Sequence, residues 1–179
     1  MQRAAQAGAV TVVVALLGLL VWDLVHDSGS KIPDAVRDGE VVAAPLWTRD
    51  RVDTTGTLSL ASLRGKVVVL NFWQSYCAPC THEARTLANA ARAWEEKGVV
   101  FVGVDVQDFR SKALKFLERF DIDYPIVKDN GSLVGHYGVI GYPETFFIDT
   151  KGRLVPKWHI IGPVTRADLD DGIRAARKA

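Results

Sequence analysis

The stretch VVVLNFWQSYCAPCTHE, residues 67–83, decides how the rest of the chain is interpreted. Its first part is a nearly continuous apolar run, which is typical of a strand buried on both faces. The run stops shortly before Cys77, where a long helical pattern begins. Cys77 and Cys80 are the two cysteines of the chain, and only Ala78 and Pro79 separate them. A Cys-x-x-Cys pair at a strand-to-helix junction predicts a redox-active site.

The start of a helix supplies the chemistry that such a pair needs. The first backbone N–H groups of a helix have no partner inside the helix, and the helix dipole places partial positive charge there. Both effects favour the thiolate form of a cysteine. Because the thiolate is the nucleophile in thiol–disulfide exchange, the position of Cys77 indicates catalysis.

Three other roles for the cysteine pair fit the sequence less well. A zinc site takes about four ligands, but there is no second pair, and His82, His136 and His159 are scattered along the chain. Attachment of c-type haem requires a histidine directly after the second cysteine, where this chain has Thr81. A purely structural disulfide gains more stability from closing a longer loop.

Size and charge restrict the class of protein. The chain has 179 residues and a formal net charge of +1. This length leaves room for one domain of about 135 residues after an N-terminal segment. No basic run stands out, so nucleic-acid binding has no electrostatic support.

The N-terminal segment predicts a membrane anchor. Residues 7–25 carry a single charge, Asp23, and as a helix they would span roughly 28 Å, close to the hydrocarbon thickness of a bilayer. Arg3 precedes the segment, while Asp23 and Asp27 stand at its far end, which favours a cytoplasmic N-terminus. We expect a cytoplasmic stub over 1–6 and a transmembrane helix over 7–25. A cleaved signal peptide is the alternative, although no small-x-small cleavage pattern follows the run.

Residues 26–43 are predicted to be a linker, and residues 44–179 the domain. The linker contains DSGS at 27–30 and Pro33, and as a flexible coil its ends would lie about 23 Å apart. The polarity of the anchor places the domain on the extracytoplasmic side of the cell membrane, where disulfides form and persist. A single redox pair in that location predicts action on the cysteines of other proteins.

The domain alternates strand-like and helix-like segments, as an α/β fold does. An apolar residue at every third or fourth position marks the helix that starts at Cys77 and ends at Gly98. Other helices are predicted over 111–120, over 133–137 and from 165 onward. Strands are predicted over 45–47, 57–60, 67–72, 99–106, 124–127, 145–148 and 154–161, the last two as a hairpin.

Three segments resemble one family. Residues 71–83 (NFWQSYCAPCTHE) are similar to the active-site block of the TlpA/ResA/CcmG (DsbE) group of membrane-tethered, extracytoplasmic thioredoxin-like proteins, and residues 103–108 (GVDVQD) to their next strand. Residues 138–149 (GVIGYPETFFID) resemble their proline loop, most closely that of the CcmG branch. The resemblance implies a thioredoxin-like fold. This is a central mixed sheet flanked by helices, with an N-terminal hairpin and a central insertion, preceded here by one transmembrane helix.

The same resemblance implies roles for individual residues. Cys77 matches the exposed attacking cysteine, and Cys80 matches the buried cysteine that resolves the mixed disulfide. Pro79 matches the proline at the helix start, where a missing N–H costs nothing. Pro143 matches a cis-proline that faces the cysteines, and the cis bond lets Tyr142 offer its backbone N–H and C=O to an extended substrate strand. The expected substrate-binding residues are Tyr76, Ala78, Pro79, Tyr142, Pro143 and Glu144.

Proton transfer is expected to involve Glu83. It stands three residues after Cys80, on the same helix face, and matches an acidic residue near the cysteines in this group; the alternative is a solvated helix carboxylate. Thioredoxin itself has a buried aspartate at the position of Asn71. An amide cannot take up a proton, so any acid–base work is left to Glu83, Glu144 or water. Tyr76 replaces the usual tryptophan of the family. Glu144 is expected to contact substrate, to depress the reactivity of the cysteines by its negative charge, or to lie at the surface without a role in the reaction.

The sequence therefore predicts a thiol–disulfide oxidoreductase that needs no cofactor beyond its own Cys77–Cys80 disulfide. By resemblance, its substrate is apocytochrome c, and its electrons come from a membrane thiol transporter of the CcdA type. A disulfide oxidase for exported proteins is the alternative enzyme, and a copper or haem chaperone the alternative without catalysis. A thiol peroxidase is disfavoured because Gln74 stands where peroxidases by resemblance carry Thr or Ser.

Overall fold

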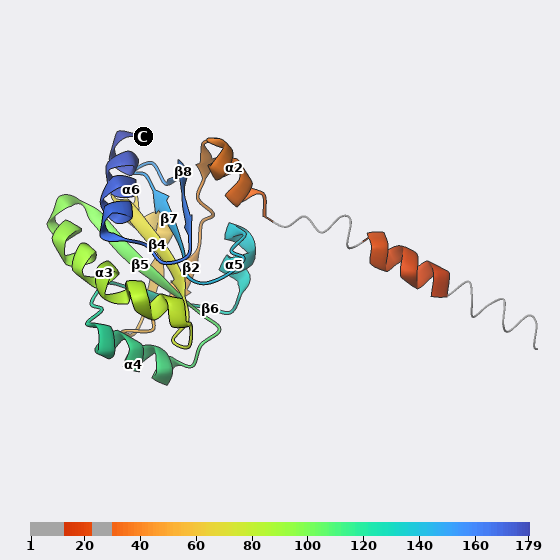
Figure 1. The fold of residues 1–179 in the computed structure, drawn as a ribbon, viewed down its shortest axis with the longest axis horizontal. Helices are drawn as coiled ribbons and strands as arrows, with labels where there is room; N and C mark the ends of the chain where they lie inside the picture. The colour runs from red at the N-terminus through yellow and green to blue at the C-terminus, as the bar shows by residue number, and fades with distance from the viewer. Residues whose placement is uncertain (1–12, 23–29) are drawn as a thin grey trace, which may run out of the picture.

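The computed structural model describes residues 13–22 and 30–179, which include one α/β domain (Figure 1). Its centre is a six-stranded sheet. In spatial order the strands are β1 (Val42–Ala43), β8 (Arg153–Ile161), β7 (Glu144–Ile148), β4 (Val67–Trp73), β5 (Val99–Val106) and β6 (Ile126–Asp129). Strands β4, β5 and β6 are parallel to one another, whereas β7, β8 and β1 join in antiparallel pairs. The sheet is therefore mixed, as predicted.

Helices cover both faces of the sheet. On one face, α3 (Ala78–Trp94), α4 (Arg110–Phe120) and α6 (Arg166–Lys178) bury their apolar sides in a shared hydrophobic cluster with the sheet. On the other face, α2 (Ile32–Asp38) and α5 (Ser132–Tyr137) contribute Val36, Leu133 and Tyr137 to a second cluster. Every residue of β4 is buried, as its apolar run predicted, because alternate side chains enter the two clusters.

A small hairpin precedes the central strand. It pairs β2 (Thr48–Asp50) with β3 (Thr57–Ser59) and leads into the short 3-10 helix η1 (Leu60–Leu63). The hairpin was predicted, but its first strand begins at Thr48 and not at Pro45. A second 3-10 helix, η2 (Glu95–Lys97), follows α3, and Gly98 then adopts the left-handed conformation that turns the chain into β5.

The linker is shorter than predicted, because part of the segment assigned to it is folded. Residues 32–43 form α2 and β1, and Val36 is fully buried. Ile32 and Val36 are four residues apart and so share the helix face that packs on the domain. Pro33 lies in the first turn of α2, where proline is tolerated, and Gly39 ends the helix in the left-handed conformation. The prediction of a flexible coil is therefore wrong for these residues.

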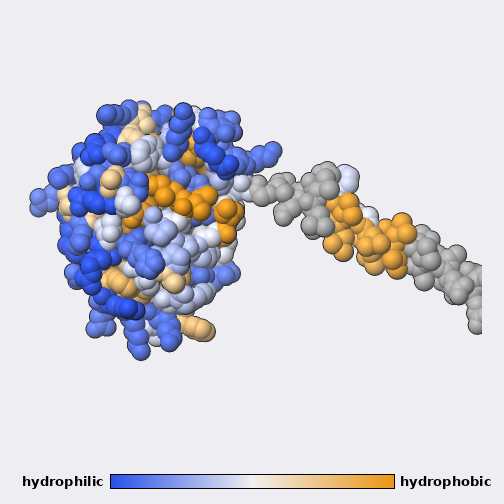
Figure 2. Space-filling view, in the orientation of Figure 1, coloured by the Kyte–Doolittle hydropathy of each residue, from blue (hydrophilic) through white to orange (hydrophobic). Residues whose placement is uncertain are grey.

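The predicted anchor falls largely outside the described residues. Of the range 7–25, residues 13–22 are described, and they are helical and exposed (Figure 2). Within the described part of the chain, no helix has the length and apolar character needed to cross a membrane. The rest of the range, like the stub over 1–6 and residues 26–29 of the predicted linker, lies outside the described residues.

Candidate active site

The two cysteines lie where β4 ends and α3 begins. Cys77 is the N-cap of α3, with an extended backbone, and Ala78 and Pro79 are the first two residues of the helix. Cys77 and Cys80 form a disulfide whose Cα atoms are 5.3 Å apart. Cys77 is 9% exposed and Cys80 only 2%. The backbone N–H of Cys80 donates a hydrogen bond to Cys77 Sγ over 3.2 Å, so the helix start stabilises negative charge on the sulfur of Cys77.

The proline loop faces this disulfide. Residues 138–143 connect α5 to β7, and the Tyr142–Pro143 peptide bond is cis, as the resemblance implied. Because β7 pairs with β4, with Glu144 opposite Phe72, the loop meets the segment that leads into Cys77. The carbonyl oxygen of Tyr142 lies 3.4 Å from Cys77 Sγ. The structure therefore brings together the two motifs that the sequence places about 65 residues apart.

Glu83 lies inside the domain, one helical turn after Cys80. Its side chain is 1% exposed. Asn71 Nδ2 donates to Glu83 Oε1 over 2.8 Å, and the backbone N–H of Val164 donates to Oε2 over 2.7 Å. Burial raises the pKa of Glu83 to about 7, and the hydrogen bonds from Val164 and Asn71 oppose this rise. The alternative of a solvated surface carboxylate is therefore wrong.

A small cavity connects this carboxyl group with the buried cysteine. It has a volume of about 10 Å³, close to the space that one water molecule occupies. Cys80 and Glu83 both line it, together with Asn71, Trp73 and Tyr124 among others. Asn71 also donates to Thr145 Oγ1 over 3.0 Å, which fixes the amide and so the position of the Glu83 carboxylate. Cys80 and Glu83 thus line one cavity of about the size of a single water molecule.

Glu144 does not contact solvent, contrary to the predictions that it contacts substrate or lies at the surface. Its side chain is fully buried. Oε1 accepts hydrogen bonds from the backbone N–H groups of Ile140 and Gly141, and Oε2 lies 2.7 Å from Nε2 of His159. The side chain of His159 is itself only 5% exposed. The GYPET pattern identifies Glu144 as the residue after the proline. It does not show that the carboxylate of Glu144 points into the domain.

The predicted substrate-binding residues differ in exposure. Tyr76, Ala78 and Pro79 are exposed, Tyr142 is half-buried, and Pro143 is buried. Two apolar residues outside the predicted set, Phe109 and Ile140, are even more exposed than Tyr76. Asp108 Oδ2 accepts from the backbone N–H of Ser75, and Oδ1 accepts from Phe109, both over 2.7 Å, so Phe109 lies near the segment before Cys77. Figure 2 shows an apolar band on a mostly hydrophilic face of the domain.

Asp105 is a buried acid that the sequence analysis missed. It lies on β5 beside Trp73 of β4, and neither carboxylate oxygen has a hydrogen-bond partner among the described residues. Burial raises the pKa of Asp105 to about 7, the negative charge of Asp108 raises it further, and Lys128 on β6 opposes them. Its place within an apolar strand run indicates burial but not that its carboxylate lacks hydrogen-bond partners among the described residues.

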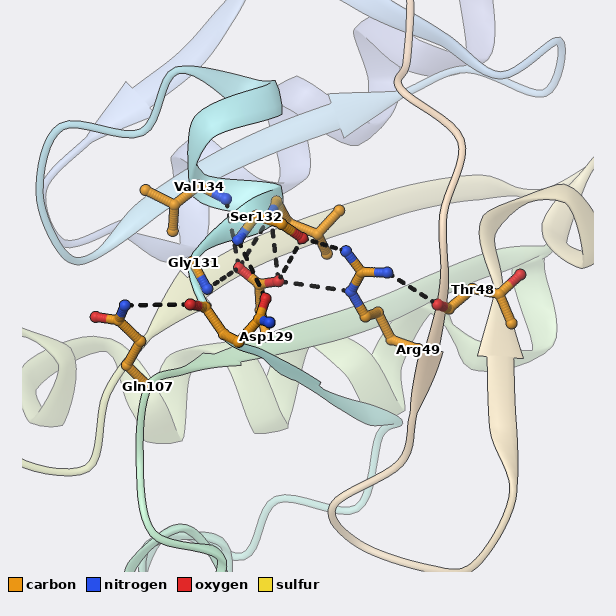
Figure 3. A network of polar contacts seen from close by, with 9 residues as sticks. Thr48, Arg49, Gln107, Asp129, Gly131, Ser132 and Val134 are labelled. Atoms are coloured by element: carbon orange, nitrogen blue, oxygen red, sulfur yellow. Dashed lines mark hydrogen bonds and ion pairs between the residues drawn. The ribbon is translucent and has the colours of Figure 1, made fainter.

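A polar network secures the helix from which the proline loop emerges. Asp129, at the end of β6, accepts hydrogen bonds from the backbone N–H groups of Gly131, Leu133 and Val134 (Figure 3). It also pairs with Arg49 of the hairpin over 3.5 Å. The network satisfies the first N–H groups of α5 and ties this helix to β2.

Within the described residues, no group of three or more His, Cys, Asp or Glu side chains converges in the manner of metal ligands.

Comparison with known proteins agrees with this geometry. The family model described as "AhpC/TSA family" matches residues 42–156. The chain is 39% identical over 137 residues to the thiol:disulfide interchange protein DsbE of Pseudomonas fluorescens biotype C, covering 75% of this chain and 74% of that protein. It is 33% identical over 114 residues to the thiol-disulfide oxidoreductase ResA of Bacillus cereus, covering 63% of this chain and 65% of that protein.

Solved structures show the same fold. The crystal structure of a thiol:disulfide interchange protein of the thioredoxin family from Chlorobium tepidum TLS superposes with a TM-score of 0.69 at 28% identity. The match covers 78% of this chain and 98% of that one. The thioredoxin-like fold implied by the resemblance is thereby confirmed.

Proposed function

This chain belongs to the AhpC/TSA family, as a thiol–disulfide oxidoreductase of the ResA and DsbE type, and on that premise we propose that it reduces disulfides of exported proteins, with apocytochrome c as its substrate. The observation that carries the proposal is the position of Cys77 Sγ, 3.4 Å from the Tyr142 carbonyl oxygen and at the start of α3. The backbone of a substrate strand docks at this loop and brings its disulfide to Cys77.

The reaction consists of two exchanges. The Cys77 thiolate attacks one sulfur of the substrate disulfide, the substrate S–S bond breaks, and one substrate thiolate leaves. The Cys80 thiolate then attacks Cys77 Sγ, releases the second substrate thiolate and forms the Cys77–Cys80 disulfide. Two electrons pass to the substrate, which takes up two protons. Glu83, across the one-water cavity, accepts the proton of Cys80 before the second attack.

The electrostatics suit this division of roles. The N–H of Cys80 stabilises negative charge on Cys77, so Cys77 is the nucleophile. A carboxyl group with a pKa of about 7 can both take and return a proton near neutral pH, which a surface glutamate cannot do. The direction of electron flow depends on the reduction potential of the pair relative to its partners. We propose the reducing direction because the proline loop resembles that of the CcmG branch.

The setting is part of the same proposal. Residues 7–25 form the anchor, residues 1–6 are cytoplasmic, and the domain lies on the extracytoplasmic side of the cell membrane. The apolar, exposed surface of the helix over residues 13–22 supports the anchor. A membrane thiol transporter of the CcdA type supplies the electrons. The domain boundary moves toward residue 31, because α2 packs on the domain.

Trapping the mixed disulfide tests the function. In a Cys80→Ser variant, expressed in the native cell lacking the wild-type gene, the substrate stays attached to Cys77 and survives non-reducing electrophoresis. Apocytochromes c are expected among the trapped proteins, and external reductant is expected to restore holocytochrome c in the deletion strain. The Cys77→Ser/Cys80→Ser variant is the control and traps nothing. If deletion instead leaves the cysteines of many exported proteins reduced, the protein is an oxidase.

A further inference from the structure

A buried carboxylate–imidazole pair lies directly behind the proline loop. Glu144 is the first residue of β7, and His159 lies on the adjacent strand β8. Their side chains are 0% and 5% exposed, and Glu144 Oε2 lies 2.7 Å from His159 Nε2. The ring of His159 stacks on Phe146, with centroids 4.1 Å apart and an interplanar angle of 9°. The pair is therefore fixed by packing as well as by the hydrogen bond.

The second oxygen of Glu144 holds the loop itself. Oε1 accepts hydrogen bonds from the N–H of Ile140 over 2.8 Å and from the N–H of Gly141 over 3.0 Å. These two residues stand immediately before Tyr142, whose carbonyl oxygen lies 3.4 Å from Cys77 Sγ. A continuous set of contacts thus runs from His159 through Glu144 and the loop backbone to the nucleophile.

A buried carboxylate needs its partner. Removing the hydrogen-bond partner of a buried carboxylate leaves that group desolvated and unpaired, and the structure relaxes to relieve this. For Glu144, the available relaxation is rotation of its carboxylate away from the site that His159 vacates. That rotation would release Ile140 and Gly141, since both bond the same carboxylate. The position of the Tyr142 carbonyl then depends on the Nε2–H group of His159.

We propose that His159 is a positioning residue for thiol–disulfide exchange: by orienting Glu144 it holds the Tyr142 backbone in the place where a protein substrate docks beside Cys77. This inference rests on the proposed docking of substrate at the proline loop. It assigns His159 no contact with substrate and no proton transfer. Its consequence is selective: exchange with a polypeptide disulfide depends on His159, whereas exchange with a small disulfide that needs no backbone docking does not.

The surroundings of His159 allow this to be tested by substitution. The residue lines a surface hollow of about 350 Å³ together with Arg37, Lys157 and Ile161. A side chain of slightly different shape therefore has room to adjust without entering the core. His159→Phe keeps a ring to stack on Phe146 but removes the N–H. His159→Gln loses the ring but keeps an N–H donor near the position of Nε2.

Two kinetic assays separate the roles. The reduced protein is mixed with a synthetic peptide carrying a Cys-x-x-Cys-His disulfide, and separately with 2,2′-dithiodipyridine. We expect His159→Phe to slow exchange with the peptide about ten- to a hundredfold, by a rise in KM, with the rate toward dithiodipyridine unchanged. His159→Gln is expected to recover most of the peptide rate. The matched control, His136→Phe, changes an exposed histidine of α5 and leaves both rates at the wild-type level.

Amide hydrogen exchange provides the second measurement and does not require an active enzyme. In the wild type, the N–H groups of Ile140 and Gly141 are expected to be protected from exchange. In His159→Phe they are expected to exchange at least about ten times faster. If His159→Phe does not fold, His159→Asn takes its place in this measurement. Unchanged protection, an unchanged peptide rate, or an equal loss toward both disulfides would overturn the inference. A wild-type protein that exchanges with dithiodipyridine but not with the peptide would instead count against the proposed function, and the amide data would still decide the role of His159.

Discussion

Asn71 donates a hydrogen bond to Glu83 over 2.8 Å, and this contact joins the centre of β4 to the first turns of α3 beneath the disulfide. The amide cannot take up a proton, so the only titrating member of the pair is the carboxyl group of Glu83. Its fixed position, its raised pKa and the cavity that it shares with Cys80 support the proposal that acid–base chemistry is done from the helix and not from the strand. The predictions below follow from this arrangement.

The two cysteines should differ in reactivity. Cys77 is the more exposed and receives the N–H of Cys80 at the helix start, so its thiolate should form at lower pH. In the reduced protein, we expect iodoacetamide to alkylate Cys77 at least about tenfold faster than Cys80 at neutral pH. Mass spectrometry of each cysteine against pH measures this. Faster alkylation of Cys80 would reverse the roles assigned to the two residues.

Glu83 should make the oxidised protein less stable as pH rises. Its pKa is about 7 in the folded state against an ordinary 4.5, so between these values the folded state binds more protons than the unfolded state. The free energy of unfolding then falls as pH increases through this window, by about 3 kcal/mol in total. Glu83→Gln should make that part of the profile shallower by this amount and leave the contribution of Asp105, whose folded-state pKa is also about 7. Urea unfolding at pH 4.5 to 8 measures this, and Glu118→Gln, at an exposed carboxyl on α4, should leave the profile unchanged. A wild-type slope in Glu83→Gln would show that Glu83 is ionised throughout.

Asn71→Asp should be destabilising above neutral pH. The substitution places a second carboxyl group within hydrogen-bond distance of Glu83, and two adjacent buried carboxyl groups cannot both ionise cheaply. We expect one of them to stay protonated to a pH well above 7 and the free energy of unfolding at pH 8 to drop by about 2 kcal/mol or more. Asn89→Asp, at an exposed position of α3, is the matched control. Equal stability of the two variants at pH 8 would count against the buried environment described for Glu83.

Asp105→Asn should stabilise the protein at alkaline pH. Asp105 has a folded-state pKa of about 7 because of burial and the charge of Asp108, against an ordinary 3.8. Its ionisation in the folded state therefore costs stability as pH rises from about 4 through 7. The amide variant should be about 4 kcal/mol more stable than wild type at pH 8, and the difference should vanish near pH 4. Asp34→Asn, at an exposed site on α2, should change little at either pH, and a similar effect of both variants would refute the account.

Much of the fold followed from the sequence because the decisive elements have strong local patterns. The apolar run of β4, the spacing of apolar residues in α3 and the capping box of Thr165 and Asp168 each specify an element without help from the rest of the chain. The α2 segment escaped prediction because about two turns with a single buried residue, Val36, are too short to show a periodicity. Its helix depends on packing against β8 and β1, which is tertiary information.

The motifs of the site could be predicted from the sequence, but the contacts between its buried side chains could not. Cys77, Cys80 and Pro143 belong to short sequence motifs whose chemistry can be recognised from the sequence alone. The hydrogen bond from Asn71 to Glu83 and the contact of Glu144 with His159 each join residues from different strands or helices. The lack of a hydrogen-bond partner for Asp105 among the described residues also depends on how the strands and helices are arranged around it. Whether a given carboxyl group is solvated or buried depends on those contacts, so spacing along the chain could not distinguish the two for Glu83 or Glu144.

The direction of exchange with apocytochrome c is the most direct test of the function. Purified reduced protein is mixed with an equimolar amount of apocytochrome c whose haem-binding cysteines form a disulfide, and the thiols of both are counted by mass spectrometry after acid quenching. We predict rapid conversion to reduced apocytochrome c and one Cys77–Cys80 disulfide per reaction, with Cys77→Ser inactive. Contradiction would be the reverse flow, in which the oxidised protein converts apocytochrome c thiols to the disulfide and the reduced protein leaves the apocytochrome c disulfide intact.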